Sequence, residues 1–172
     1  MVNCIPDFAQ VMVNIRANNL DAMEVIENRV VNAFKVSADS IGARMEYKTE
    51  TGVLPLVTND ILYELYARNA KEFIPPENFQ IVETMPSSSD LGDISQLMPV
   101  LYPMAGGIVG TGHGADFKMV NFENAVLLPA KLLGAVIIDI LSENGVMGKQ
   151  IVEQYKPSMT IEEYLSYWDK KD

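Results

Sequence analysis

The stretch VLLPAKLLGAVIIDIL, residues 126–141, is the longest apolar run in the sequence, and it decides what kind of fold to expect. It is shorter than the about 20 apolar residues that span a bilayer, and it includes Lys131 and Asp139. A buried helix of a globular protein is therefore predicted here. Pro129 is expected to kink or restart this helix, and Gly145 is expected to end it.

The composition of the 172 residues indicates an acidic globular protein. An apolar share of 48% is enough to build a hydrophobic core. The formal net charge of −10 repels phosphate, which argues against nucleic acid and anionic membranes as partners. The single cysteine, Cys4, cannot form an intrachain disulfide, and the first residues do not have the pattern of a secretory leader. These features predict a cytoplasmic protein.

The first part of the chain has the pattern of a strand, a helix and a second strand. Residues 9–16 alternate between apolar and polar side chains, as a half-buried strand does. Residues 20–34 carry apolar side chains at three- and four-residue spacing, which is typical of an amphipathic helix, and residues 44–48 alternate again. A segment with glycine and proline then predicts a boundary between domains at residues 1–50 and 51–172.

The second part is expected to combine helices with short strands, which gives an α/β fold class. A helix is predicted after Thr58, which can cap it, and a pair of prolines marks its end. Residues 81–83 and 99–108 are predicted strands, and the longer of the two should be buried. Near the C-terminus, Thr160 and Glu163 have the spacing of a capping box.

His113, the only histidine, is the first candidate for chemistry. It lies in the loop GTGHGADF, residues 110–117, between two glycines that free the imidazole to face a ligand such as a metal ion. One histidine without companions does not define a metal site. A surface histidine without a ligand is therefore the alternative interpretation.

Asp90 and Asp93 are the second candidate, within SSSDLGD at residues 87–93. Because they are three residues apart, their carboxylates can share one face of a helical turn. There they could orient a metal ligand by hydrogen bonding without binding the metal themselves. The alternative is that Ser89 or Asp90 only caps this turn. Ser89 as a nucleophile with His113 as its base is a weaker hypothesis, because the G-x-S-x-G elbow is absent.

Asn3 is the third candidate, within NCIPD directly before the first predicted strand. Its amide can form hydrogen bonds with a substrate carbonyl or carboxylate. Turn formation is the alternative, because Asp7 follows Pro6.

At these three places the sequence resembles the M20 metallopeptidase and amidohydrolase family, in its aminobenzoyl-glutamate hydrolase-like and aminoacylase-like branch. VNCIPD at residues 2–7 and NIR at residues 14–16 are similar to the branch's VNVIPD and D-x-R. SSDLGDIS at residues 88–95 is similar to G-S-T-D-x-G-(D/N)-V-S, and the His113 loop is similar to G-x-x-H-(S/T)-x-x-F. The positions that depart from the family pattern are Asn14, Ser87 and Gly114.

The resemblance implies a role for each part of the chain. Residues 1–50 would be the second half of a ferredoxin-like lid and dimerisation domain. Residues 51–172 would be the C-terminal part of a zinc-peptidase-like catalytic domain. His113 would be a metal ligand and Asn3 a substrate-binding residue. The residues that would support the site from its loops are Asp90, Asp93 and Gly112.

The resemblance also shows what this sequence lacks. The family's H-x-D or C-x-H metal motif, its acidic pair with the general base and its lid histidine have no counterpart here. A two-metal site holds a bridging water between cations while a carboxylate removes its proton, so one ligand cannot replace it. We therefore expect this chain to be inactive and to bind no metal stably by itself, whether it is a split gene product, a truncated reading frame or an expressed fragment.

The complete enzyme would use a divalent metal, either zinc or else manganese or cobalt, to cleave the amide bond of N-acyl or aminobenzoyl amino acids. Partners expected for this chain are the missing N-terminal half or further copies of itself, because half a lid leaves an unpaired sheet edge. The alternative is a non-catalytic binding or assembly module derived from the same family.

Overall fold

The computed structural model describes residues 5–82 and 88–169. The chain divides into two compact units, Met1–Thr49 and Glu50–Asp172, next to the boundary predicted from the sequence. Both helices and strands are present, and helices predominate. Each unit is described by itself below.

The first unit is built around the helix α1 (Leu20–Ser40), which the apolar spacing predicts. Asn19 caps the helix, because its side-chain oxygen accepts a hydrogen bond of 2.8 Å from the backbone N–H of Ala22. At the other end, the N–H groups of Ile41 and Gly42 bond to carbonyls of the last turn. The helix therefore begins and ends through local hydrogen bonds.

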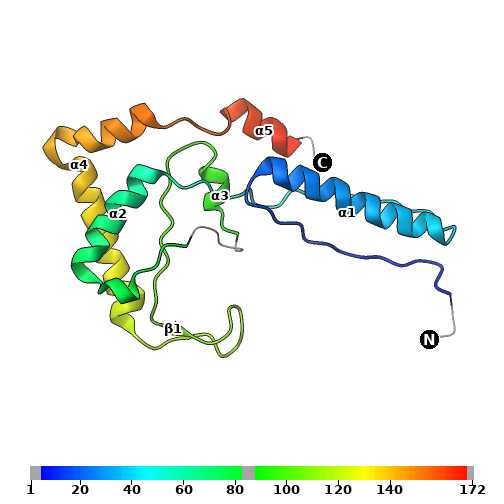
Figure 1. Ribbon diagram of the computed structural model, residues 1–172, viewed down its shortest axis with the longest axis horizontal. Coiled ribbons are helices and arrows are strands. Elements are labelled where there is room, and N and C mark those ends of the chain that lie inside the picture. Colours follow the sequence, from blue (N-terminus) through cyan, green and yellow to red (C-terminus); the bar gives the residue numbers. More distant parts are fainter. Residues whose placement is uncertain (1–4, 83–87, 170–172) are drawn as a thin grey trace. The chain divides into compact units, whose positions relative to one another are not determined.

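The strands predicted at residues 9–16 and 44–48 are not formed. Both segments are irregular backbone, and the first runs back along α1 (Figure 1). Alternating apolar and polar side chains suit the two faces of a strand. A strand also needs a neighbouring strand that donates and accepts its backbone hydrogen bonds. Among residues 5–49 no side chain is fully buried. The described residues of this unit therefore leave their apolar side chains partly or fully exposed and form no buried core.

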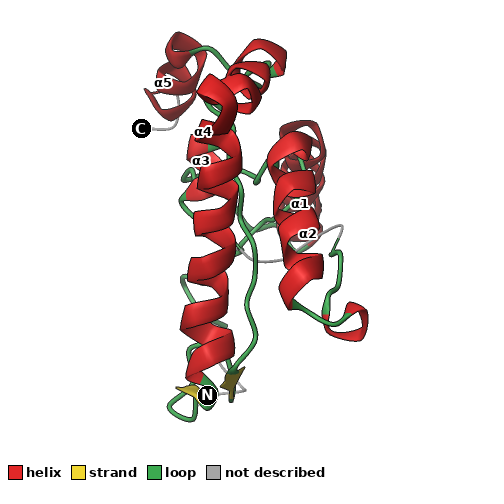
Figure 2. Cartoon of the chain, turned by 90° about the vertical axis from the view of Figure 1, so that its left-hand side faces the viewer, coloured by secondary structure: helices red, strands yellow, loops and turns green. Residues whose placement is uncertain are grey.

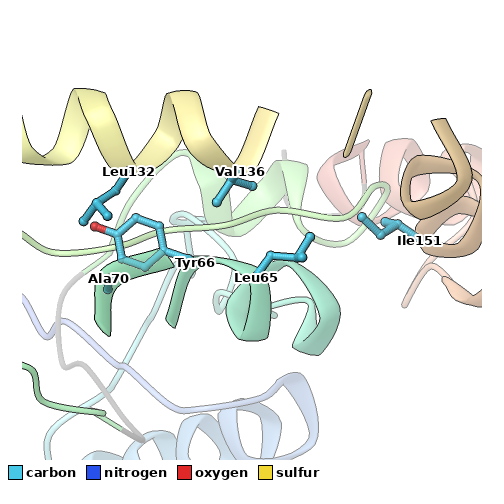
Figure 3. Packing of buried hydrophobic residues seen from close by; sticks show 6 residues of the cluster. All are labelled: Leu65, Tyr66, Ala70, Leu132, Val136 and Ile151. Atoms are coloured by element: carbon cyan, nitrogen blue, oxygen red, sulfur yellow. The ribbon is translucent and has the colours of Figure 1, made fainter. Parts of the chain in front are cut away.

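The second unit has its core between α2 (Asp60–Phe73) and α4 (Leu128–Gln154). Figure 3 shows side chains of the two helices directed towards one another. The buried cluster comprises Leu65, Tyr66, Ala70, Leu132, Val136 and Ile151. The α2 helix ends at Phe73, one residue before the two prolines, as the sequence predicts, and the short helix η1 (Pro76–Asn78) follows.

The cap of α2 is Asn59 and not the predicted Thr58. The Asn59 side-chain oxygen accepts a hydrogen bond of 3.0 Å from the N–H of Leu62. The Asn59 N–H donates to the carbonyl of Val100 at 3.2 Å. Asn59 therefore both caps the helix and ties it to the buried segment around Val100, and this long-range contact fixes where the helix starts.

The apolar stretch at residues 126–141 forms a helix, as predicted, but the predicted burial is wrong. A π-helical turn, η2 (Glu123–Leu127), precedes α4, and Pro129 lies in the first turn of α4. Leu132 and Val136 are buried against α2, whereas Ile137 is 55% exposed. By length and composition alone, Glu123–Gln154 is apolar enough to cross a membrane.

The α4 helix is interrupted where the sequence predicts its end. Glu143, Asn144 and Gly145 have φ values of 52°, 58° and 70°, in the left-handed region, and Ser142 is extended. Left-handed residues terminate a helix because they turn the backbone away from its axis. A further helical segment follows this break as far as Gln154.

The predicted strand at residues 99–108 is formed only at its last residue. The strand β1 (Ile108–Val109) pairs antiparallel with β2 (Lys118–Met119), with Ile108 opposite Met119. Ile81 and Val82 belong to no strand, and the rest of that prediction lies outside the described residues.

Two further helices complete the second unit. They are α3 (Leu91–Ile94) and α5 (Ile161–Asp169). The capping box before α5 is confirmed. The Thr160 N–H donates to a carboxylate oxygen of Glu163 at 2.8 Å, and the Glu163 N–H donates to the Thr160 hydroxyl at 3.1 Å.

Candidate functional site

The β1–β2 hairpin carries His113 at its tip. The hairpin is closed at its base by the carbonyl of Gly107, which accepts hydrogen bonds from the N–H groups of Val120 and Asn121 at 2.9 and 3.1 Å. Gly110, where the chain leaves β1, has a φ of 99°, and any side chain there would collide with the backbone of Asp116. The sequence thus needs glycine at this bend.

Asp116 fixes the shape of the loop. Both of its carboxylate oxygens lie 3.2 Å from the N–H of Thr111, and the carbonyl of Thr111 accepts a hydrogen bond of 2.7 Å from Gly114. A Cβ at Gly114 would lie only 2.6 Å from a carboxylate oxygen of Asp116. A side chain at Gly114 would therefore displace the Asp116 carboxylate from its place in this loop, whereas a Cβ at Gly112 would meet nothing within 4 Å.

The imidazole of His113 points into open surroundings. His113 has a φ of 62°, in the left-handed backbone region that residues other than glycine rarely adopt. The residue is exposed, and its side chain has no hydrogen-bond partner within the described part of the chain. The loop therefore holds an accessible histidine in a strained backbone conformation, and its nitrogens have no hydrogen-bond partner among residues 5–82 and 88–169.

The described residues do not fit a metal centre by themselves. Across residues 5–82 and 88–169, no group of three or more His, Cys, Asp or Glu side chains could hold a metal ion. The nearest carboxylate in sequence, Asp116, is engaged with Thr111. Figures 1 and 2 show the β1–β2 hairpin beyond the start of α4 and apart from α3.

Asp90 and Asp93 have different surroundings. Asp90 directly precedes α3, is exposed, and makes no capping hydrogen bond with its side chain. The Ser89 hydroxyl instead accepts a hydrogen bond of 3.3 Å from the N–H of Leu91. Of the two residues that could cap this turn, Ser89 is the one that does so.

Asp93 is turned into the protein. Burial raises the pKa of its carboxyl, and hydrogen bonds from the backbone of Leu54 and from Tyr164 offset part of that rise. One oxygen, Oδ1, is buried without a partner among the described residues. Next to it, Gly92 packs so closely on Leu54 that a Cβ would overlap the Leu54 carbonyl. Asp93 thus joins α3 to the segment before α2 and to α5.

Ser95 and Gln96 complete this junction, and the sequence reasoning missed them. The Ser95 hydroxyl accepts from the N–H of Val57 at 2.9 Å and donates to the carbonyl of Gly92 at 2.7 Å. The Gln96 amide donates to the carbonyl of Pro55 at 2.6 Å. Both side chains are almost completely buried.

The C-terminal part of the chain binds to the same two residues. The hydroxyl of Tyr155 donates to the Ser95 carbonyl at 3.0 Å, and the N–H of Met159 donates to the Gln96 carbonyl at 3.2 Å. The sequence signal for this junction is a pair of polar residues between apolar ones, Ile94-Ser-Gln-Leu97, because buried polar side chains need hydrogen-bond partners. The α3 region therefore organises three segments of the second unit.

Asn3, the predicted substrate-binding residue, and Cys4 lie outside the described residues. Comparison of this chain with models of protein families, with curated proteins and with solved structures finds no match. The assignment to a family and the roles of the site residues therefore stay predictions from the sequence.

Proposed function

We propose that this chain is the C-terminal portion of a metal-dependent amidohydrolase of the M20 type, acting on the amide bond of N-acyl or aminobenzoyl amino acids. In this proposal the chain contributes His113 to a site that residues outside this sequence complete. The supporting observation is the hairpin tip, where Gly110 and Asp116 shape a loop that leaves the imidazole exposed and without a hydrogen-bond partner in the described part of the chain.

The same proposal requires that the chain is inactive alone. A lone imidazole does not hold a divalent cation, because stable sites combine three or four ligands. The role of α3 in the proposal is to stabilise the fold of the second unit, since Asp93, Ser95 and Gln96 contact other segments of that unit.

The exposed apolar side chains of the second unit support a chain that other polypeptide covers. Ile137, Ile138 and Leu141 are 55%, 66% and 68% exposed, and contiguous apolar surface of this kind marks interaction sites.

Reconstitution tests the proposal. The chain is co-expressed with a polypeptide that carries an H-x-D motif and an acidic pair, and the purified complex is assayed on N-acetyl amino acids and aminobenzoyl-glutamate with zinc, manganese or cobalt. Its metal content is measured by atomic emission. We expect a metal-loaded, active complex, and neither metal nor activity in the chain alone.

His113→Ala separates ligation from assembly. The variant should still form the complex but should lose at least part of its metal content, because a ligand has been removed. Glu153→Ala, at an exposed carboxylate on the last turns of α4, is the matched control and should keep the metal. An unchanged metal content in His113→Ala would refute the role of His113.

The second candidate function is a non-catalytic assembly module, and the exposed apolar side of α4 favours it. The same experiment separates the two. A stable complex that contains no metal and hydrolyses none of these substrates supports the assembly module and counts against the hydrolase.

A further inference from the structure

The break in α4 contains the dipeptide Asn144-Gly145. The backbone from Ser142 to Gly145 is non-helical and separates α4 into two helical halves, the second of which ends at Gln154. Figure 1 shows the ribbon changing direction within α4. Asn144 is the only asparagine in the sequence that is followed by glycine. The break therefore coincides with a dipeptide that has a chemistry of its own.

An asparagine followed by glycine can react with its own backbone. The glycine nitrogen, once it has lost its proton to a base, attacks the side-chain carbon Cγ of the asparagine. The new C–N bond closes a five-membered succinimide ring, the Cγ–Nδ2 bond breaks, and Nδ2 takes up a proton and leaves as ammonia. Water then opens the ring at either carbonyl, which leaves aspartate or isoaspartate. Glycine favours the first step because it has no Cβ to obstruct the approach.

The side chain of Asn144 is accessible. It is exposed, and it has no hydrogen-bond partner among residues 5–82 and 88–169. Four other asparagine side chains are held by hydrogen bonds, namely those of Asn19, Asn59, Asn69 and Asn121. The amide of Asn144 can therefore rotate towards the nitrogen of Gly145 without losing a contact to the described part of the chain.

The backbone of the dipeptide lies outside regular helix. Asn144 and Gly145 have φ values of 58° and 70°, in the left-handed region that glycine adopts freely and asparagine more readily than most residues. Inside a regular helix, the rotation that brings the nitrogen to Cγ would first have to open a hydrogen-bonded turn. At the break the same rotation moves residues that are already non-helical.

We propose that Asn144-Gly145 is a site of spontaneous covalent modification, at which the asparagine becomes aspartate and isoaspartate in the folded chain. Isoaspartate leads the main chain through Cβ and Cγ, so it adds one backbone atom between the two halves of α4. The second half is anchored by Ile151, which is 6% exposed, and by Tyr155 directly after it, whose hydroxyl donates to the Ser95 carbonyl at 3.0 Å. The modification therefore weakens the connection between these anchors and the first half.

Mass spectrometry of the aged chain tests the site. The purified chain is incubated at mildly alkaline pH, once folded and once in guanidinium chloride, and is digested with trypsin at intervals. The peptide of residues 132–149 contains Asn144 as its only asparagine and has no glutamine, so a gain of one mass unit locates the reaction. We expect the folded chain to react at a rate within about tenfold of the unfolded chain, because exposed irregular segments open at little cost in free energy. Enzymatic methylation of isoaspartate should identify the rearranged product.

The chain offers an internal control and a matched variant. The peptide of residues 119–131 should stay unmodified over the same period, because its asparagines, Asn121 and Asn124, precede residues that carry a Cβ. Asn144→Gln should abolish the mass gain in residues 132–149, because the longer side chain would have to close a six-membered ring. After equal ageing, the urea midpoint of unfolding should fall for the wild type and stay constant for Asn144→Gln.

A folded chain that stays unmodified while the unfolded chain reacts would overturn the proposal, because the break would then hold the dipeptide out of reach of the reaction. A modified wild type with the urea midpoint of aged Asn144→Gln would overturn the weakened connection between the halves of α4. The result is independent of the proposed function, because the reaction needs neither a metal nor a second polypeptide and leaves the His113 loop unchanged.

Discussion

Asp93 is the residue at which burial and hydrogen bonding oppose one another. Its carboxylate accepts hydrogen bonds from the backbone of Leu54 and from Tyr164, but Oδ1 is buried without a partner among the described residues. Burial disfavours the charged form more than the hydrogen bonds favour it, so the pKa of Asp93 is raised. The charge of Asp90 adds to this rise.

This raised pKa predicts a pH-dependent stability. The folded chain holds the proton of Asp93 more tightly than the unfolded chain does. The contribution of this carboxyl to the free energy of unfolding is therefore greatest at low pH, and it falls as the pH rises from the ordinary value of 3.8 through the higher pKa of the folded state. Asp93→Asn removes this titration. The free energy of unfolding of the variant should therefore rise relative to that of the wild type as the pH increases from 3.8 through the higher pKa of the folded state.

Urea unfolding of both proteins over a series of pH values measures this difference. Glu153→Gln, which changes an exposed carboxylate, should run parallel to the wild type. A constant difference between Asp93→Asn and the wild type at all pH values would show that Asp93 does not titrate in this way.

At the scale of elements, the start of α2 shows how a helix boundary is chosen. Thr58 and Asn59 are adjacent, and both are residue types that cap helices. Asn59 is selected because its N–H also bonds to the Val100 carbonyl, while its side chain bonds to Leu62. Asn59 thus caps the first turn of α2 and also links the helix to a segment that is distant in sequence.

Asn59→Ala should therefore lower the free energy of unfolding by about 1 kcal/mol, which is typical for loss of a helix cap. The adjacent substitution Thr58→Ala is the matched control and should change it by less than about 0.5 kcal/mol, as exposed positions usually do. Urea unfolding followed by circular dichroism measures both. Equal losses in the two variants would mean that the cap is not at Asn59.

At the scale of the whole molecule, the stability of the second unit depends on the contact of α2 with one side of α4. Leu132 and Leu133 are adjacent in α4 but are 1% and 40% exposed. Leu132→Ala leaves a cavity between the helices, and we expect it to cost about 2–5 kcal/mol of the free energy of unfolding. Leu133→Ala should cost less, because its side chain is already in contact with water.

These two variants are compared by urea unfolding at the lowest usable protein concentration, where association contributes least. If Leu133→Ala proved as destabilising as Leu132→Ala under these conditions, the side of α4 that carries Leu133 would be buried within a single chain.

The sequence by itself determined the elements whose hydrogen bonds are local. The spacing of apolar residues predicts α1, the two prolines predict the end of α2, Gly145 predicts the break in α4, and Thr160 with Glu163 predicts the cap of α5. A helix satisfies its backbone groups within its own segment, so a short stretch of sequence is enough to specify it.

The tertiary structure alone decided which patterns became strands, which side chains were buried and which carboxylates faced inwards. Residues 9–16 and 44–48 alternate as strands do but pair with no neighbour, and the apolar run at residues 126–141 has a partner on one side only. Asp93 turns into the protein while Asp90 stays exposed. Each of these outcomes requires a second surface from a distant part of the chain or from another molecule, and a local pattern contains no information about that surface.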